Sequence, residues 1–267
     1  MKLSALSLVT AAVLAVGVPA SAHAQSAETL PYDHIHLNVP DPAAAFQWYL
    51  KNFGGTVNDE APNRINYGTT RLMFLVKKDA TQPSAGSAVD HIGFSFADLD
   101  AKMKEFEANG VKTTTPLRDL PGVFKLGFVE DPWGTRIEVV QDAELLGLHH
   151  IHMRAANPEE TFKWLLAHFG GERTPLKGKL DAIKYKAAGL SDVWVLVSKG
   201  ETTPTLGRAL DHIGWRVKDL NAKVAELKAK GATMETEPRP LNLPNKTTIY
   251  YAYVVGPSGA RIELVQR

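Results

Sequence analysis

The sequence predicts an α+β protein made of four β-α-β-β-β units, arranged as two homologous halves. Three observations support this prediction. Strand-like runs that open with histidine occur four times, helix signatures recur at matching places, and two later strand-like runs each carry a glutamate between aliphatic residues. Self-similarity at matching intervals is typical of a repeated architecture.

The first 24 residues are predicted to be a secretory signal peptide. Lys2 precedes an apolar run from about Leu6 to Val18, which is too short to span a bilayer. Residues 22–24, Ala-His-Ala, then supply the small-x-small pattern that signal peptidase prefers. We expect cleavage before Gln25, a mature protein in the periplasm or outside the cell, and no membrane association after cleavage.

Composition excludes several other classes of protein. The chain of 267 residues has no cysteine, so it contains neither a disulfide framework nor a lipid-anchored cysteine. Its 30 basic residues face 29 acidic ones, and loss of Lys2 with the signal makes the two equal. This balance does not favour nucleic acid as a partner. Stability must come from a packed core, which a chain of this length can form.

Two pairs of predicted helices mark the repeat. Residues 41–55 recur as residues 157–171, and both copies place an N-cap residue before a proline and two glycines after the helix. Residues 98–110 recur in the same way as residues 219–231. We therefore divide the mature chain into a first domain at residues 25–143 and a second at residues 144–267, joined by a short linker.

In each half, strands are expected after both helices. After the first helix they are expected at residues 64–67 and 72–76, matched by 182–186 and 193–197. After the second they are expected at residues 124–129 and 135–140, matched by 247–255 and 260–265. Proline-rich loops at residues 116–121 and 238–244 precede the last strands. Such loops often rim a site, although surface loops without a role are the alternative.

Side-chain alternation along these strands decides what the histidines face. In residues 33–39 the aliphatic side chains would pack against the helices, which leaves His34 and His36 on the opposite, polar face. Glu138 would point to the same face, and a carboxylate in such an aliphatic strand is costly unless it is exposed or paired. The second half repeats this pattern with His150, His152 and Glu263.

Each half thus carries two histidines at strand openings and one glutamate, in the same order. Nitrogen and oxygen donors in this ratio suit a divalent metal that keeps positions for substrate. His36 and His152 lie one strand period from the proposed ligands. They are either acid/base groups beside the metal or simple polar lining of a cavity. His149 is expected to be only a flanking residue.

With these motifs the chain resembles the vicinal-oxygen-chelate superfamily, which includes glyoxalase I, methylmalonyl-CoA epimerase, extradiol dioxygenases and bleomycin-resistance proteins. The Asp-His-Ile openings and the closing run Asp-Pro-Trp-Gly-Thr-Arg-Ile-Glu at residues 131–138 carry the resemblance, which spans essentially all of the mature chain. It implies two tandem domains with cupped mixed sheets and a divalent ion such as Fe(II), Mn, Zn or Ni. It also implies a small substrate bound through two neighbouring oxygens. By similarity the two metal sites would consist of His34, His91 and Glu138, and of His150, His212 and Glu263.

Two departures from the family pattern bear on the reaction. Glyoxalase I takes a further glutamate from the last strand of its first module, and the epimerases take a glutamine. That place falls near Met73 and Trp194 here, which argues against glyoxalase-type isomerisation. The extradiol signature is partly matched by Tyr253 ahead of Glu263, but Gly256 replaces its acidic residue and its histidine is missing.

We therefore expect an exported metal-dependent enzyme for a small oxygenated molecule, with dioxygenase-type chemistry favoured, because three ligands leave open positions as in non-haem iron oxygenases. Tyr253 and Tyr251 would act as hydrogen-bonding or acid/base groups. A glyoxalase-like lyase or isomerase using His36 or His152 as base is the second alternative. A non-catalytic, resistance-type protein that binds a small molecule is the third. Both a monomer and a homodimer are compatible with the sequence.

Overall fold

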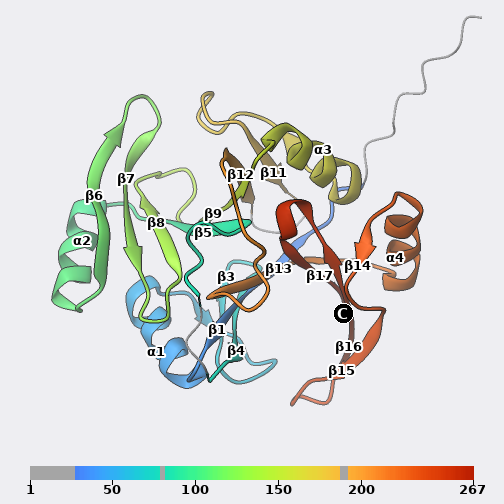
Figure 1. The fold of residues 1–267 in the computed structure, drawn as a ribbon. Coiled ribbons are helices and arrows are strands. Elements are labelled where there is room, and N and C mark those ends of the chain that lie inside the picture. The colour runs from blue at the N-terminus through green and yellow to red at the C-terminus, as the bar shows by residue number, and fades with distance from the viewer. Residues whose placement is uncertain (1–27, 79–81, 187–191) are drawn as a thin grey trace, which may run out of the picture.

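A computed structural model describes residues 28–78, 82–186 and 192–267. The predicted signal peptide at residues 1–24 lies outside these ranges. Within them the fold is α+β, with four α-helices around two mixed sheets, as predicted (Figure 1). No helix in the described ranges is long and apolar enough to cross a membrane.

The same order of elements recurs four times. The first module contains β1 (Tyr32–Val39), α1 (Pro42–Phe53), β2 (Thr56–Val57), β3 (Arg64–Tyr67) and β4 (Thr70–Val76). The second contains β5 (Val89–Ser95), α2 (Leu99–Ala108), β6 (Lys112–Leu120), β7 (Phe124–Glu130) and β8 (Arg136–Val140). The third contains β9 (Gly147–Ala155), α3 (Pro158–Phe169), β10 (Glu172–Arg173), β11 (Ala182–Tyr185) and β12 (Val193–Lys199). The fourth contains β13 (Leu210–Arg216), α4 (Leu220–Ala229), β14 (Thr233–Met234), β15 (Arg239–Asn242), β16 (Thr248–Val255), the 3₁₀ turn η1 (Pro257–Gly259) and β17 (Arg261–Gln266).

Local sequence explains where the helices begin and end. The side chain of Asp41 accepts hydrogen bonds from the backbone N–H groups of Ala43 and Ala44, and Pro42 opens α1. Gly54, at φ 68°, ends α1 in a conformation that favours glycine. Asn157 and Gly170 play the same parts in α3.

Each sheet combines strands from both halves of the chain. The nine-stranded sheet has the order β14-β16-β17-β13-β1-β4-β3-β2, with β15 paired to β16, and so joins the first and fourth modules. The eight-stranded sheet has the order β10-β11-β12-β9-β5-β8-β7-β6 and joins the second and third modules. In each sheet one antiparallel pair joins the two halves of the chain, and we call these pairs the seams: β1–β13 and β5–β9. Residues 25–143 and 144–267 are thus homologous in sequence, whereas each sheet draws on both.

One continuous core connects all four modules. Ile35, Phe94, Ile151 and Trp215 are fully buried in it, one from each module. A separate apolar cluster, which we call the apolar plug, lies on the eight-stranded sheet and consists of Phe124, Leu126, Phe128, Val140, Leu176, Ala182 and Leu196. The nine-stranded sheet carries a smaller apolar cluster of Leu243, Ile249 and Val265. The larger apolar cluster covers part of the eight-stranded sheet, whereas the nine-stranded sheet has a cavity beside its smaller cluster.

Candidate metal centre

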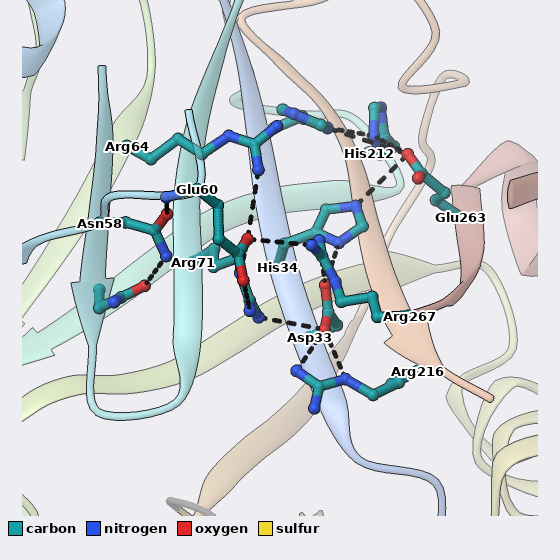
Figure 2. Close-up of polar contacts among 12 residues, drawn as sticks. Asp33, His34, Asn58, Glu60, Arg64, Arg71, His212, Arg216, Glu263 and Arg267 are labelled. Carbon is teal, nitrogen blue, oxygen red and sulfur yellow. Dashed lines mark hydrogen bonds and ion pairs between the residues drawn. The ribbon is translucent and has the colours of Figure 1, made fainter. Parts of the chain in front are cut away.

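Four side chains meet on the nine-stranded sheet, and we call this group cluster one. His34 and His36 come from β1, His212 from β13 and Glu263 from β17, and one ligand atom of each lies within 4.8 Å of the others. Oε2 of Glu263 is 2.9 Å from Nε2 of His212, 3.4 Å from Nε2 of His34 and 3.9 Å from Nδ1 of His36. Figure 2 shows His34, His212 and Glu263 turned toward one another from three strands.

The hydrogen bonds of these histidines fix where their protons lie. Nδ1 of His34 is 2.8 Å from Oδ1 of Asp33, and Nδ1 of His212 is 2.7 Å from Oδ1 of Asp211. An ionised carboxylate only accepts hydrogen bonds, so each Nδ1 carries a hydrogen, and in the neutral form of each ring the Nε2 lone pair is directed toward Glu263. Nε2 of His34 is buried and makes no hydrogen bond. Lone pairs converging on a carboxylate need a cation between them, so this donor set fits a divalent metal ion.

The charges around cluster one favour an ionised glutamate. Burial raises the pKa of Glu263, but His34 and His212 outweigh burial and hold this pKa well below its ordinary value. Burial and the neighbouring His212 lower the pKa of His36 well below the ordinary histidine value, so His36 is neutral. For His34, burial lowers the pKa, but Glu263 and Asp33 raise it more. A metal ion would therefore displace a proton from His34.

Two glycines leave room for the rings. Gly214 on β13 lies opposite His34 in the strand register, and a Cβ atom at Gly214 would collide with the imidazole. Gly93 on β5 has the same relation to His150. The Asp-His-Ile-Gly sequences of the second and fourth modules thus each supply a ligand and the space for a ligand from the neighbouring strand.

A second group, which we call cluster two, forms on the eight-stranded sheet from His91, Glu138, His150 and His152. Oε2 of Glu138 is 2.9 Å from Nε2 of His91 and 3.2 Å from Nε2 of His150. Nδ1 of His91 is 2.6 Å from Oδ1 of Asp90, as in cluster one. Nδ1 of His150 instead lies 2.8 Å from Nδ1 of His149, whose Nε2 is 3.2 Å from Oδ2 of Asp142. His149, expected to be only a flanking residue, is buried and supports His150.

The structure corrects how the six predicted ligands are grouped. Placing His34 with His91 and Glu138 is wrong, because β1 pairs with β13 and not with β5. Placing His150 with His212 and Glu263 is wrong for the matching reason, because β9 pairs with β5. All six residues lie in the two clusters, but each cluster takes residues from both halves.

His36 and His152 join the clusters as further donors, a position that sequence alternation left undecided. His36 lies in register with Met73 of β4, and Nδ1 of His36 is 2.6 Å from Nε2 of His212. His152 lies in register with Leu196, so the counterpart of Met73 is Leu196, and the expected position at Trp194 is two residues off. Neither Met73 nor Leu196 offers an oxygen ligand, and the histidines on the adjacent strands supply the fourth donor.

A cavity of about 410 Å³ lies beside cluster one. His36 and Glu263 line it together with both predicted catalytic tyrosines, Tyr251 and Tyr253. The hydroxyl of Tyr253 donates a hydrogen bond of 2.9 Å to Oε2 of Glu263. Burial and the charge of Glu263 raise the pKa of Tyr253, so the phenol keeps its proton. Residues 241–244 form part of the wall, so the proline-rich segment lies at the site. The prediction that it is a loop is wrong, because residues 239–242 form β15, and residues 116–120 of the first half likewise belong to β6.

The apolar plug covers cluster two. It occupies the place in the eight-stranded sheet that corresponds to the cavity beside cluster one in the nine-stranded sheet. Phe128 lies opposite Glu138 in the register, and its ring meets His91 edge-on at 5.2 Å between ring centroids. Leu196 lies opposite His152 in the same way. Where Tyr253 faces Glu263 in the nine-stranded sheet, Phe128 faces Glu138 in the other. Cluster two thus has hydrophobic neighbours with no proton to donate.

The comparisons with known proteins agree with this fold. Residues 32–139 match the family model described as Glyoxalase/Bleomycin resistance protein/Dioxygenase superfamily. The structure of glyoxalase I from Zea mays is 19% identical, with 89% of this chain and 92% of that chain covered at a TM-score of 0.67. A putative dioxygenase from Bacillus subtilis subsp. subtilis str. 168 is 16% identical, with 90% and 86% covered at a TM-score of 0.59. No curated protein sequence matches the chain.

At such low identity the two structures share the fold with this chain and nothing finer follows from them. The motifs at residues 33–39 and 131–138 lie within or at the end of the segment that matches the family model. The second half repeats the modules of the first. Residues 32–139 therefore match the glyoxalase/bleomycin resistance protein/dioxygenase superfamily model, and the chain shares its fold with the two solved structures over most of its length.

Proposed function

We propose that the protein is a metal-dependent enzyme that acts on a small oxygenated molecule at cluster one, with dioxygenase-type chemistry as the leading candidate. One observation carries this proposal: three imidazoles and a carboxylate converge at a cavity that also contains two tyrosines. A bound divalent ion would supply Lewis acidity or activate oxygen. His34, His36, His212 and Glu263 would hold it.

The residues around the metal position have separate tasks in this proposal. Asp33 and Asp211 keep the Nε2 lone pairs of His34 and His212 directed at the centre. Tyr253 holds a proton 2.9 Å from Glu263 and would donate it to an oxygen of the bound substrate. The apolar part of the cavity wall would exclude water from the reacting atoms.

A glyoxalase-like lyase or isomerase is the second candidate. Such a reaction needs a base that takes a proton from carbon. Among the described residues that line the cavity, His36 and Glu263 are the bases, and both are donors of cluster one. A non-catalytic binding protein is the third candidate, but it has no need for the complete donor set.

We propose that cluster two binds a second ion with a structural role, because the apolar plug leaves it apolar neighbours in place of tyrosines. We also propose export of the protein, with the mature chain beginning at Gln25. N-terminal sequencing of protein from the periplasm or medium tests export, and cytosolic protein that keeps Met1 would refute it.

The test of function compares the two glutamates. Elemental analysis of the purified protein should find close to two divalent ions per chain, about one in either Glu263→Ala or Glu138→Ala, and none in the double variant. After screening of catechols, 2-oxo acids and α-hydroxy thioesters, Glu263→Ala should remove most turnover and Glu138→Ala much less. Metal retained by the folded double variant would refute the metal centres. A larger loss from Glu138→Ala would move the active site to cluster two.

A further inference from the structure

An excess of positive charge lies beside the cavity at cluster one. Asp33 and Glu60 are surrounded by four arginines from four different strands or strand ends, as Figure 2 shows: Arg64, Arg71, Arg216 and Arg267. Two carboxylates cannot neutralise four guanidinium groups, so the group carries net positive charge. Arg71 and Arg216 each make close hydrogen bonds within it.

Two of these arginines, Arg64 and Arg267, line the cavity. Arg64 is the less engaged of the two, because its contact with Glu60 is 3.4 Å long. Burial, with a smaller contribution from the neighbouring Arg267, lowers the pKa of Arg64 from its ordinary value. Arg267 reaches Oε2 of Glu60 at 3.0 Å and Oδ1 of Asp33 at 3.1 Å.

The strand register fixes where Arg64 lies relative to the metal position. His36 on β1 is paired with Met73 on β4, and Met73 is paired with Arg64 on β3. Paired residues share a face, and two strand spacings place the backbone of Arg64 roughly 10 Å from that of His36. The opposite wall consists mainly of apolar side chains that include Leu241, Leu243 and Ile249.

The eight-stranded sheet supplies an internal comparison. His152 is paired with Leu196, and Leu196 with Ala182, so Ala182 occupies the place of Arg64. Ala182 belongs to the apolar plug. Counting four residues from each cluster glutamate, Asp142 stands where the other sheet has Arg267. The pair of arginines is therefore particular to the sheet that has the cavity.

We infer that the cavity selects a substrate with a carboxylate at the end opposite its metal-binding oxygens, held by Arg64 and Arg267. A guanidinium fork matches a planar carboxylate, and charge-assisted hydrogen bonds of this kind are among the strongest in proteins. The apolar wall accommodates a hydrocarbon or aromatic body between the two ends. The metal-binding end rests on the proposed function, whereas the carboxylate end rests on the arginines alone.

Matched probes test this inference. The metal-loaded protein is titrated by calorimetry with 3,4-dihydroxybenzoate and with 3,4-dihydroxybenzamide, which share the vicinal oxygens and differ in charge at the other end. The carboxylate should bind at least about tenfold more tightly, and this preference should fall as salt is added. Arg64→Gln should bring the ratio of the two affinities close to one, and Arg64→Lys should restore part of it.

Arg118→Gln provides the control, because it removes the same charge from an exposed position on β6 in the other sheet. Its affinity ratio should equal that of the unaltered protein. Thermal unfolding of each variant establishes that it is folded. An affinity ratio near one in the unaltered protein, or one that persists in folded Arg64→Gln, overturns the inference.

Benzoate and benzamide, which have no vicinal oxygens, repeat the comparison on metal-free protein by NMR titration. A preference for benzoate that Arg64→Gln abolishes supports the arginine pair even if the metal proposal fails. Dihydroxy probes that bind only with metal, and without preference for the carboxylate, support the metal centre and refute the arginine pair. The two proposals therefore fail separately.

Discussion

An aspartate directly precedes three of the cluster histidines, and each aspartate bonds to the ring beside it. Asp33, Asp90 and Asp211 lie 2.8, 2.6 and 2.7 Å from Nδ1 of the following histidine. Successive side chains of a strand point to opposite faces, yet the carboxylate of each aspartate still reaches the ring of the histidine that follows it. Arginines in turn bind these aspartates, for example Arg136 with Asp90 and Arg261 with Asp211. One dipeptide thus provides both a candidate ligand and the group that orients it.

At the residue scale we predict that cluster one loses metal as pH falls, and at a higher pH than an ordinary histidine would. Glu263 and Asp33 raise the pKa of His34 although burial lowers it, and a proton on Nε2 occupies the lone pair that the metal needs. Below that pKa the affinity should fall about tenfold per pH unit. Glu263→Gln should weaken binding at neutral pH and move the decrease to lower pH. Titrations with Co(II) between about pH 5 and 8 measure both effects; an unshifted decrease would contradict the role of Glu263.

Tyr253 gives a second prediction at this scale. Tyr253→Phe removes the hydroxyl beside Glu263 while keeping the ring, so kcat should fall by about 10²–10⁴-fold with metal content unchanged. Tyr250→Phe is the matched control, because Tyr250 is on the same strand with its side chain 47% exposed, and it should keep full activity. An active Tyr253→Phe enzyme would show that the proton comes from elsewhere.

At the scale of elements, each cluster lies at its own seam, so a substitution at one seam should disturb one cluster and leave the other intact. Gly214→Ala would force the His34 ring away from β13, and Gly93→Ala would do the same to His150 on β5. Each change should cost about 1–3 kcal/mol of unfolding free energy through overcrowding. Gly214→Ala should lose the ion of cluster one and the activity, whereas Gly93→Ala should keep both. Calorimetric unfolding and elemental analysis measure the outcome, and equal loss of activity in both variants would contradict the separation.

The strands and helices themselves could be predicted from the sequence, since caps, glycines and alternation are local signals. The partner of each seam strand could not, because an internal repeat gives β5 and β13 the same histidine opening and β1 pairs equally well with either by pattern. One signal was available. The shortness of residues 141–146 favours placing β9 in the sheet that contains β8.

The contrast between the cavity and the apolar plug was visible in one strand pair. Tyr251 and Tyr253 stand where the first half has Leu126 and Phe128. The rest of the contrast could not be read from the sequence, because the residues that complete each wall come from other modules. Leu196 and Ala182 reach the plug from the third module, while Arg64 and Met73 reach the cavity from the first.

At the scale of the whole molecule, neither half should fold alone as a monomer. Residues 25–143 would keep β1 and β5 without the seam partners that they have in the full chain, and would expose two unpaired edges. Mixing this fragment with residues 144–267 should restore a one-to-one complex that binds two ions. Gel filtration and circular dichroism of each fragment and of the mixture test this. A half that is a folded, metal-binding monomer would contradict the interleaved pairing.

The interleaved order of the strands also imposes a sequence of events during folding. The eight-stranded sheet uses the uninterrupted stretch from β5 to β12, whereas the nine-stranded sheet closes the first module against the fourth. His36 must meet His212 across 176 positions, and long loops of this kind close slowly. On a chain that emerges N-terminus first, β1 can pair with β4 early, but its pairing with β13 must wait until most of the other strands have appeared. The eight-stranded sheet is therefore expected to form first and serve as a template. The cavity, with its arginines and tyrosines, is expected to be the last part of the protein to assemble.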